Sequence, residues 1–217
     1  MALPWETIDR VTTAEGPLEL RRRGRDFLIT IAGRVLMTSA ARRAEEDLAR
    51  IALEGRPDAR VLIGGLGMGF TLRAALDALS PAGRVVVAEL TPEVAAWCRG
   101  PMAGLTDDAL ADPRVELRIA DVAGEIRKAR ADFDAVLLDL YEGPNASTQG
   151  PDDPFYGTAA LAAARRALRP GGVLAVWSEE PDRAFEERLA RAGFRDVDRH
   201  RGGRGGRAHV VYTGISP

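Results

Sequence analysis

The sequence predicts an α/β fold with a mostly parallel sheet, preceded by a small β segment, on the strength of three observations. From residue 60 onward, short apolar segments rich in β-branched residues alternate with helical segments. Strands such as RVVVAEL are apolar almost throughout, as expected for a sheet covered on both faces. The last apolar segment, AHVVYTG, follows a Gly-rich turn instead of a helix, which predicts an antiparallel last strand.

The first 54 residues come before this alternation. Residues 18–38 look like two or three short strands, because FLITI is β-rich and turn residues flank it. Residues 40–54 contain Ala, Leu, Glu and Arg but no Gly or Pro, which predicts a helix. We therefore divide the chain into an N-terminal β-hairpin segment, 1–39, and a Rossmann-like domain, 40–217.

Five strand–helix units follow. The predicted strands are 60–64, 84–90, 114–120, 134–140 and 172–178, and the helices that follow them are 69–79, 92–99, 122–130, 157–168 and 181–192. Helices between successive strands require right-handed crossovers, and so a parallel sheet. The final strand, 208–214, is expected to pair antiparallel with a strand near 195–200.

Composition excludes several classes of protein. The 217 residues are 46% hydrophobic, enough for a sizeable core, and the net charge of −2 gives no general attraction to nucleic acid or anionic membranes. A single cysteine and two histidines predict neither a disulfide framework nor a metal site. With no apolar run near the ~20 residues of a membrane span and no signal peptide, we expect a cytoplasmic protein.

The segment VLIGGLGMGF (61–70) is the first functional signal, because four glycines follow a buried strand. Ligands of open α/β sheets bind beyond the carboxyl ends of the strands, where the strand order reverses. Glycines there let a ligand approach the backbone, and the helix that begins near Gly69 offers free N–H groups. The alternative is that the glycines only pack a helix tightly onto a strand.

Three acids end the strands beside this loop. Glu89 lies twenty residues after Gly69 and can accept both hydroxyls of a ribose. Asp121 can accept from an adenine amino group, although it can equally cap the helix that follows. Asp139 ends the strand DAVLLD and faces the same crevice. Together these positions predict a pocket for an adenine nucleoside.

Two nucleoside cofactors compete for this pocket. The loop reads G-x-G-x-G and lacks the G-x-G-x-x-G of NAD sites. Strand-end acids continuing to 121 and 139, with an antiparallel last strand, favour S-adenosylmethionine (SAM). The expected nucleoside-binding residues are Gly64, Gly65, Gly67, Met68, Gly69, Glu89, Leu90, Asp121 and Val122.

Residues 25–178 resemble the spermidine synthase family, the polyamine aminopropyltransferases on a SAM-methyltransferase fold. The segments that carry the resemblance are VLIGGLGMGFTLRAAL, VVVAEL, IADV, FDAVLLDLYEGP and ALRPGGVLAVW. The resemblance implies that Glu89 holds the ribose and that Asp121 with Val122 flanks the adenine. It also implies that Asp139 and the acid three residues later serve an amine substrate, and that the protein is a homodimer.

The chain departs from this family in its glycine loop. Family members usually carry G-G-G-D-G-G where this chain has GGLGMG, so Gly67 stands at the family's Asp. That Asp is expected to bind the cationic aminopropyl end of decarboxylated SAM. SAM itself carries a carboxylate there, which an Asp would repel. The Gly therefore favours SAM as the co-substrate.

Two further departures concern the acceptor. The family's D-x-x-D appears as Asp139-Leu-Tyr-Glu142, and Glu142 is either a general base or a solvated loop residue. The family's Gln and its Tyr-His-Glu are absent, and the charged run at 42–47 suggests a solvated helix face. Aromatic residues follow Asp139 and can either contact the acceptor or pack in the core: Tyr141, Phe155, Tyr156 and Trp177.

Our leading interpretation is a SAM-dependent transferase that moves a methyl group to a small acceptor such as an amine. Its catalytic candidates are Asp139, Tyr141 and Glu142, and no metal is expected. The alternative is an aminopropyltransferase that uses decarboxylated SAM. A third interpretation is a non-catalytic nucleoside or RNA-binding module that uses RGGRGGR (201–207), although a flexible loop fits that short segment better. Residues 142–154 would suit a lid.

Overall fold

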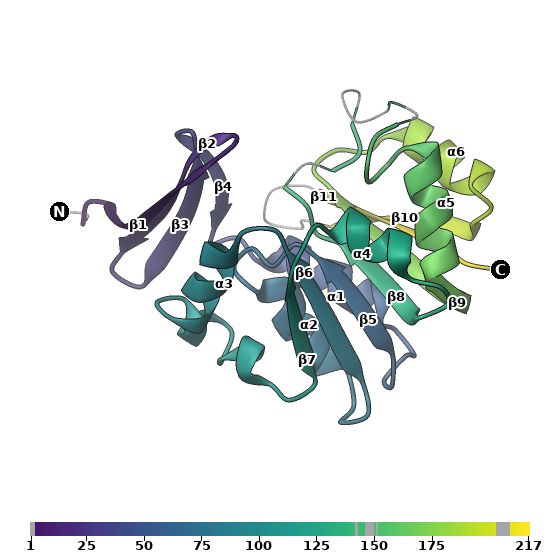
Figure 1. The fold of residues 1–217 in the computed structure, drawn as a ribbon, viewed down its shortest axis with the longest axis horizontal. Coiled ribbons are helices and arrows are strands. Elements are labelled where there is room, and N and C mark those ends of the chain that lie inside the picture. The colour runs from purple at the N-terminus through teal and green to yellow at the C-terminus, as the bar shows by residue number, and fades with distance from the viewer. Residues whose placement is uncertain (1–2, 142, 146–149, 151, 203–208) are drawn as a thin grey trace.

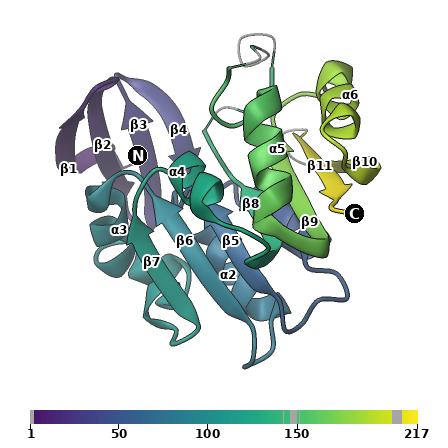
Figure 2. The ribbon, with the colours of Figure 1, turned by 45° about the vertical axis from the view of Figure 1, so that its right-hand side comes forward.

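The computed structural model describes residues 3–141, 143–145, 150, 152–202 and 209–217. Two sheets form the fold, and the smaller, N-terminal sheet lies at one end of the larger one, beside α3 (Pro92–Arg99) (Figure 1, Figure 2). No helix in these ranges has the length and apolar character needed to cross a membrane. The seven-stranded sheet, with helices between its strands, confirms the predicted α/β class.

The larger sheet has seven strands in the order β10-β11-β9-β8-β5-β6-β7. The strands are β5 (Arg60–Gly64), β6 (Arg84–Glu89), β7 (Val115–Ile119), β8 (Phe133–Leu138), β9 (Leu168–Ser178), β10 (Arg195–Gly202) and β11 (His209–Ile215). The five strands β5 to β9 are parallel, whereas β11 runs antiparallel to both β9 and β10, as predicted. The chain order reverses between β5 and β8, so the crevice for a ligand opens at the end of β5.

Both faces of this sheet are buried, which explains its apolar strands. In β5, Val61 and Ile63 point into one core cluster while Leu62 points into the other. The helices are α1 (Arg43–Ala52), α2 (Phe70–Ala78), α4 (Val122–Lys128), α5 (Thr158–Ala167) and α6 (Arg183–Arg191), besides α3. Helices α1 to α3 cover one face and α4 to α6 cover the other. A parallel sheet requires such two-sided cover.

The N-terminal sheet is larger than the sequence predicted. Its strands are β1 (Glu6–Thr13), β2 (Gly16–Arg23), β3 (Asp26–Ile31) and β4 (Arg34–Thr38), in that order and antiparallel. The prediction of two or three strands missed β1, whose residues are mostly exposed or half-buried and carry no clear apolar alternation. The division of the chain at residue 39 into two domains remains a prediction.

The inner face of this sheet shares a core with the larger sheet. Leu20, Ile29 and Ile31 join the cluster that contains α1, α2 and α3. The indole Nε1 of Trp97 on α3 donates a 2.6 Å hydrogen bond to Asp9 on β1. Apolar packing and this bond hold the N-terminal sheet beside the ends of β5 and β6.

The predicted helices and strands differ from the observed ones mainly at their ends. Strand β9 begins at Leu168 and not at Gly172, because Leu168 already pairs with Phe133 of β8, before a register shift that leads to the pair Ala135–Val173. Two short 3₁₀ turns between α3 and β7, Ala103–Leu105 and Ala109–Ala111, have no counterpart in the prediction. Neither difference moves a residue of the candidate site.

Candidate active site

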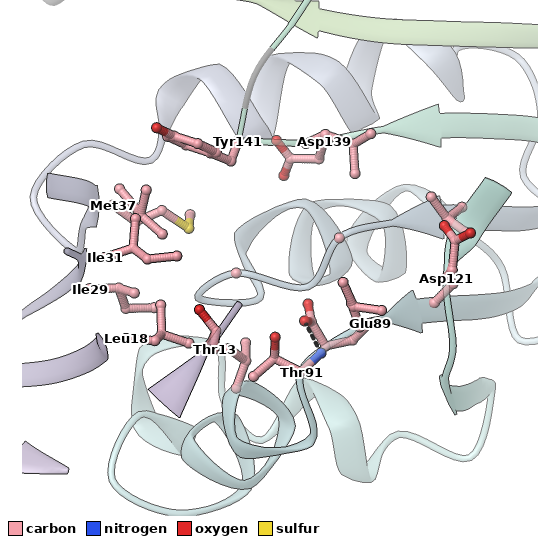
Figure 3. Close-up of a pocket in the computed structure, with 18 of the residues that line it drawn as sticks. Thr13, Leu18, Ile29, Ile31, Met37, Glu89, Thr91, Asp121, Asp139 and Tyr141 are labelled. Carbon is pink, nitrogen blue, oxygen red and sulfur yellow. Dashed lines mark hydrogen bonds between the residues drawn. The ribbon is translucent and has the colours of Figure 1, made fainter. Parts of the chain in front are cut away.

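A cavity of about 410 Å³ lies between the carboxyl ends of β5, β6 and β8 and the inner face of the N-terminal sheet (Figure 3). Its position is the one predicted from the reversal of strand order. The lining residues are Thr13, Ala14, Glu15, Leu18, Ile29, Ile31, Leu36, Met37, Glu45, Gly65, Gly67, Ala88, Glu89, Leu90, Thr91, Val94, Ala120, Asp121, Val122, Asp139, Leu140, Tyr141, Phe155 and Trp177.

Two glycines of the loop after β5 line the cavity. Gly65 has a φ of +89°, and a Cβ there would collide with the carbonyl oxygen of Asp139. Gly67 has a φ of +53°, and a Cβ there would collide with the thioether of Met37. The left-handed backbone favours glycine at both positions. At position 65 the backbone carbonyl of Asp139 also leaves no room for a side chain, whereas at position 67 the neighbour is the flexible end of Met37.

The other three loop residues predicted to bind the nucleoside lie behind the cavity surface. A Cβ on Gly64 would collide with Val122, and Met68 is buried in the core. Gly69, with a φ of +84°, directly precedes α2. These residues shape the loop but are absent from the cavity lining, so direct contact with a nucleoside is not the role their geometry suggests.

Glu89 ends β6 and reaches back beneath the loop. Its Oε2 accepts a hydrogen bond from the Leu66 amide (2.9 Å), and its Oε1 accepts one from the Thr91 amide (2.8 Å, the dashed line in Figure 3). The residue is only 8% exposed, and burial raises the pKa of its carboxyl above the ordinary value, although the backbone donors oppose this. The two amides fix the carboxylate at the cavity wall, where its remaining lone pairs can accept from ribose hydroxyls.

Asp121, Val122 and Leu90 line the same side of the cavity. The Asp121 carboxylate accepts a hydrogen bond from the Ala123 amide (2.9 Å). It therefore caps α4, which was the alternative role predicted for it from the sequence. It also faces the cavity, so capping and nucleoside binding remain compatible. Val122 is buried, whereas Leu90 is 71% exposed at the cavity rim. Such an exposed leucine suits a flat aromatic base that would cover it.

Asp139 follows β8 and points into the cavity from the side opposite Glu89 (Figure 3). Its Oδ2 accepts a 2.5 Å hydrogen bond from the hydroxyl of Thr71 on α2. Loss of hydration raises the pKa of this carboxyl to about 6, although the Thr71 bond lowers it. A carboxyl poised near neutrality is suited to accept a proton.

Glu45 was missed by the sequence argument, which placed the charged run 42–47 on a solvated face. The structure corrects this: Glu45 lines the cavity from the first turn of α1. Burial first, and then the nearby Asp139 charge, raise the pKa of its carboxyl to about 7. The signal was available, because a spacing of three, four and seven residues places Glu45 on the face of Leu48, Ala49 and Ala52, which are all buried.

The N-terminal sheet supplies the apolar side of the cavity. Leu18 from β2, Ile29 and Ile31 from β3, and Met37 from β4 point toward the glycine loop (Figure 3). Thr13 ends β1, and Glu15 lies in the turn that follows it. Sequence reasoning did not find these residues, because nothing in a strand's own pattern tells which distant loop it faces.

The predicted aromatic wall is only partly present. Tyr141, Phe155 and Trp177 line the cavity, but Tyr156 does not. It is 1% exposed and packs edge-on against Phe185, 5.8 Å between ring centroids. Glu142 and residues 146–149, 151 and 203–208 lie outside the described residues, so the predicted base, six of the thirteen residues of the predicted lid and residues 203–207 of RGGRGGR have no structural description.

Charge in the cavity is one-sided. Five lining residues are acids, Glu15, Glu45, Glu89, Asp121 and Asp139, while no lysine, arginine or histidine is among the described lining residues. The guanidinium of Arg34 stacks over Tyr141 at 5.4 Å but is not part of the lining. Such a cavity favours a cationic occupant and disfavours an anionic one, most strongly where water is excluded.

Comparison with known proteins identifies a family that matches most of the chain. Residues 42–188 match the spermine/spermidine synthase domain. Polyamine aminopropyltransferase 1 of Streptomyces coelicolor is 33% identical over 141 residues, which are 64% of this chain and 25% of that protein. The polyamine aminopropyltransferase of Mycobacterium tuberculosis is 33% identical over 171 residues, 74% of this chain and 30% of that protein. The chain thus spans about a quarter to a third of these relatives' length.

Solved structures share the fold at lower identity. Spermidine synthase from Thermotoga maritima aligns with a TM-score of 0.78 and 21% identity over 97% of this chain and 73% of that one. A Burkholderia thailandensis 1,6-didemethyltoxoflavin-N1-methyltransferase aligns with a TM-score of 0.59 and 23% identity, over 82% of this chain and 80% of that one. The two enzymes carry different activities on one fold, so the fold does not choose between them.

Proposed function

Because this chain belongs to the spermine/spermidine synthase family, we propose that it transfers an aminopropyl group from decarboxylated SAM to an amine. The matched relatives named above are polyamine aminopropyltransferases. They support the aminopropyl alternative over methyl transfer, which was our leading interpretation of the sequence. The activity remains our proposal, since the chain spans only part of those relatives.

The observation that carries this proposal is that the charged side chains among the described lining residues are all acidic. Decarboxylated SAM bears a sulfonium and an ammonium, whereas SAM also bears a carboxylate. No described lining residue is basic, so the carboxylate of SAM would lie in an acidic cavity, where its partners would be neutral donors such as backbone N–H groups and the hydroxyls of Thr13, Thr91 and Tyr141. The co-substrate without a carboxylate suits this electrostatic environment better.

Residues on opposite sides of the cavity would divide the work. Glu89 would accept from the ribose hydroxyls, with Asp121 and the exposed Leu90 beside the adenine. Gly65 and Gly67 would let the chain next to sulfur pass close to the loop backbone. Asp139 lies across the cavity, where the amine would approach, and holds a carboxyl whose pKa is raised to about 6.

The reaction itself is a displacement at carbon. The lone pair of the amine nitrogen forms a bond to the aminopropyl carbon next to sulfur. The carbon–sulfur bond breaks, and its electrons stay on sulfur, which leaves neutral methylthioadenosine. The proton that the ammonium form of the amine must lose before this attack goes to a cavity carboxylate, and the product leaves as a secondary ammonium. The protein's contribution is positioning, charge and this proton acceptor.

The glycine at position 67 led the sequence argument to SAM, and the structure weakens that step. The thioether of Met37 occupies the space into which a side chain at position 67 would project. The acidic lining of the cavity as a whole favours a cationic chain end even without an acid in the loop. Absence of an acid at position 67 therefore does not exclude decarboxylated SAM.

Calorimetry with four ligands tests the proposal: SAM, decarboxylated SAM, S-adenosylhomocysteine and methylthioadenosine. We expect decarboxylated SAM and methylthioadenosine to bind at least 10-fold more tightly than their carboxylate-bearing counterparts. Product analysis with putrescine should then yield methylthioadenosine. Tight binding of SAM with release of S-adenosylhomocysteine would instead establish methyl transfer, and binding of none would remove the nucleoside site.

A further inference from the structure

Glu45, at the start of α1, has no role in the family resemblance stated above, yet it faces the same cavity as Asp139. We propose that Glu45 and Asp139 act as one acid pair that binds the acceptor's ammonium group and takes up its proton. This inference rests on the proposed function, and it assigns to the first turn of α1 a part of the acceptor site.

The packing of α1 against α2 brings the two acids together. Thr71, the second residue of α2, is 1% exposed and donates its hydroxyl proton to Oδ2 of Asp139 at 2.5 Å. The same hydroxyl oxygen lies 3.4 Å from the backbone carbonyl of Glu45. One buried threonine thus touches both members of the pair. Helix α1 cannot shift away from Asp139 without exposing its apolar face, which packs in the main core.

The charged groups around the pair are acidic. The charged groups that interact electrostatically with Glu45 are Asp139, at the end of β8, and Glu46, on the same helix, and both raise its pKa. No described basic side chain lines the cavity that separates the pair from solvent. Two carboxylates that repel each other in a poorly hydrated site retain a proton near neutral pH. The pKa directions agree, since those of Glu45 and Asp139 rise to about 7 and about 6.

A bound ammonium group would lower the pKa values of both carboxyls. Its positive charge favours the doubly ionised pair, so both carboxylates can accept N–H bonds from it. For the nitrogen to attack, the ammonium must first lose a proton, and a carboxylate of the pair is the nearest acceptor. The neutral amine then has its lone pair free for the carbon next to sulfur. The C–N bond forms as the C–S bond breaks, with its electrons on sulfur.

A purely structural role for Glu45 makes a different prediction. Acids in the first turn of a helix favour its dipole, and α1 has two, Glu45 and Glu46. Glu46 is exposed and pairs with Arg42 at 3.3 Å. If the helix dipole were the only reason for Glu45, the two acids would be equivalent. Glu46→Gln is therefore the matched control.

The first experiment needs no substrate. Carboxyl ¹³C NMR of the full chain should show Glu45 titrating near pH 7, and Asp139→Asn should lower that pKa by about one unit, since a neighbouring charge disappears. Glu46→Gln should leave Glu45 within about 0.3 unit of wild type. If Glu45 titrates at its ordinary value in wild type, or is unmoved by Asp139→Asn, the acid pair does not exist.

The second experiment uses decarboxylated SAM and putrescine. Glu45→Gln should raise the KM for putrescine at least 10-fold and move the acid limb of the kcat/KM profile to lower pH, because the carboxyl of the pair with the higher pKa is lost and Asp139 alone titrates. Glu45→Asp should restore part of the loss. Methylthioadenosine affinity should stay within about twofold of wild type. If Glu45→Gln matches Glu46→Gln in KM and pH profile, Glu45 does not bind the acceptor.

These outcomes separate the two proposals. A wild-type protein that binds methylthioadenosine and transfers the aminopropyl group, but is indifferent to Glu45→Gln, overturns the acid pair alone. A wild-type protein that transfers no aminopropyl group overturns the proposed function. The NMR titration then still decides whether Glu45 and Asp139 form a pair.

Discussion

The two sides of the cavity are built on opposite principles. On one side, the loops after β5, β6 and β8 present backbone amides and the carboxylates of Glu89 and Asp139, each held by a hydrogen bond. On the other side, the N-terminal sheet presents Leu18, Ile29 and Ile31, which are almost fully buried. The first is an acidic wall and the second an apolar wall.

This difference shows where binding energy and stability come from. Buried carboxylates with raised pKa values cost stability when ionised, so the acidic wall is maintained for its chemistry. Apolar side chains gain free energy by burial whether or not a ligand is present. Substitutions in the acidic wall should therefore damage function more than folding, and those in the apolar wall should do the reverse. The following predictions test this contrast.

Asp139→Asn should have the largest effect. The substitution keeps the size of the side chain but removes the charge and the proton acceptor at the amine's approach. We expect turnover of decarboxylated SAM with putrescine to fall roughly 10²–10⁴-fold. Methylthioadenosine affinity, measured by calorimetry, should change less than threefold. A variant that keeps more than a tenth of wild-type turnover would remove Asp139 from the chemistry.

Glu89→Ala should weaken nucleoside binding by about 1–3 kcal/mol, roughly 5- to 150-fold, because ribose hydroxyls lose a charged acceptor. The amides of Leu66 and Thr91 also lose their acceptor, so a melting curve is the necessary control. Glu93→Gln, a nearby substitution outside the cavity lining, should leave affinity unchanged. Unchanged affinity in a folded Glu89→Ala protein would exclude the ribose role.

Ile29→Ala tests the apolar wall. The side chain is 3% exposed, and its truncation should lower the free energy of unfolding by about 2–4 kcal/mol, as measured in urea. Methylthioadenosine affinity should remain within about threefold of wild type. A stable Ile29→Ala protein that has lost nucleoside binding would show that the apolar wall, too, belongs to the binding site.

Stability should depend on pH through the acidic wall. The carboxyls of Asp139 and Glu45 bind protons more tightly in the folded protein, where their pKa values are about 6 and about 7, than in the unfolded chain. Between about pH 4 and pH 8 the folded state therefore holds more protons, and its stability falls as the pH rises.

In Asp139→Asn this loss should shrink, so that the variant is about 3 kcal/mol more stable than wild type at pH 8 and equal to it near pH 4. Urea titrations at the two pH values measure both quantities. A variant less stable than wild type at pH 8 would mean that the ionised carboxylate stabilises the fold, and the contrast between the walls would fail.

Tyr141→Ala should have the smallest effect. The ring lies at the cavity mouth, 43% exposed, with the Arg34 guanidinium 5.4 Å from its centroid. Loss of this cation–π contact should lower the free energy of unfolding by about 0.5–1 kcal/mol. The KM for putrescine should rise two- to fivefold. A 100-fold loss of kcat would instead show that Tyr141 takes part in the chemistry, and the catalytic side of the cavity would then include its mouth.

The strand–loop–helix order of residues 60–178 could be predicted from the sequence because each element is specified locally. The apolar runs of β5, β6 and β8 identify the buried strands, and the glycines after β5 identify the loop. Glu89, Asp121 and Asp139 then reach one crevice simply because parallel strands end at the same edge of a sheet. Nothing beyond topology is needed to gather these three acids.

Only the tertiary structure decided what covers the crevice. The cavity beside the glycine loop is closed by the inner face of β2 and β3, the thioether of Met37 and the carboxyl of Glu45. No local sequence pattern connects these elements to the loop. The charged run at 42–47 looked solvated by composition, and only the packing of α1 against α2 put one of its acids beside Asp139. Local sequence fixes which face of an element is apolar, whereas the partner of that face depends on long-range packing.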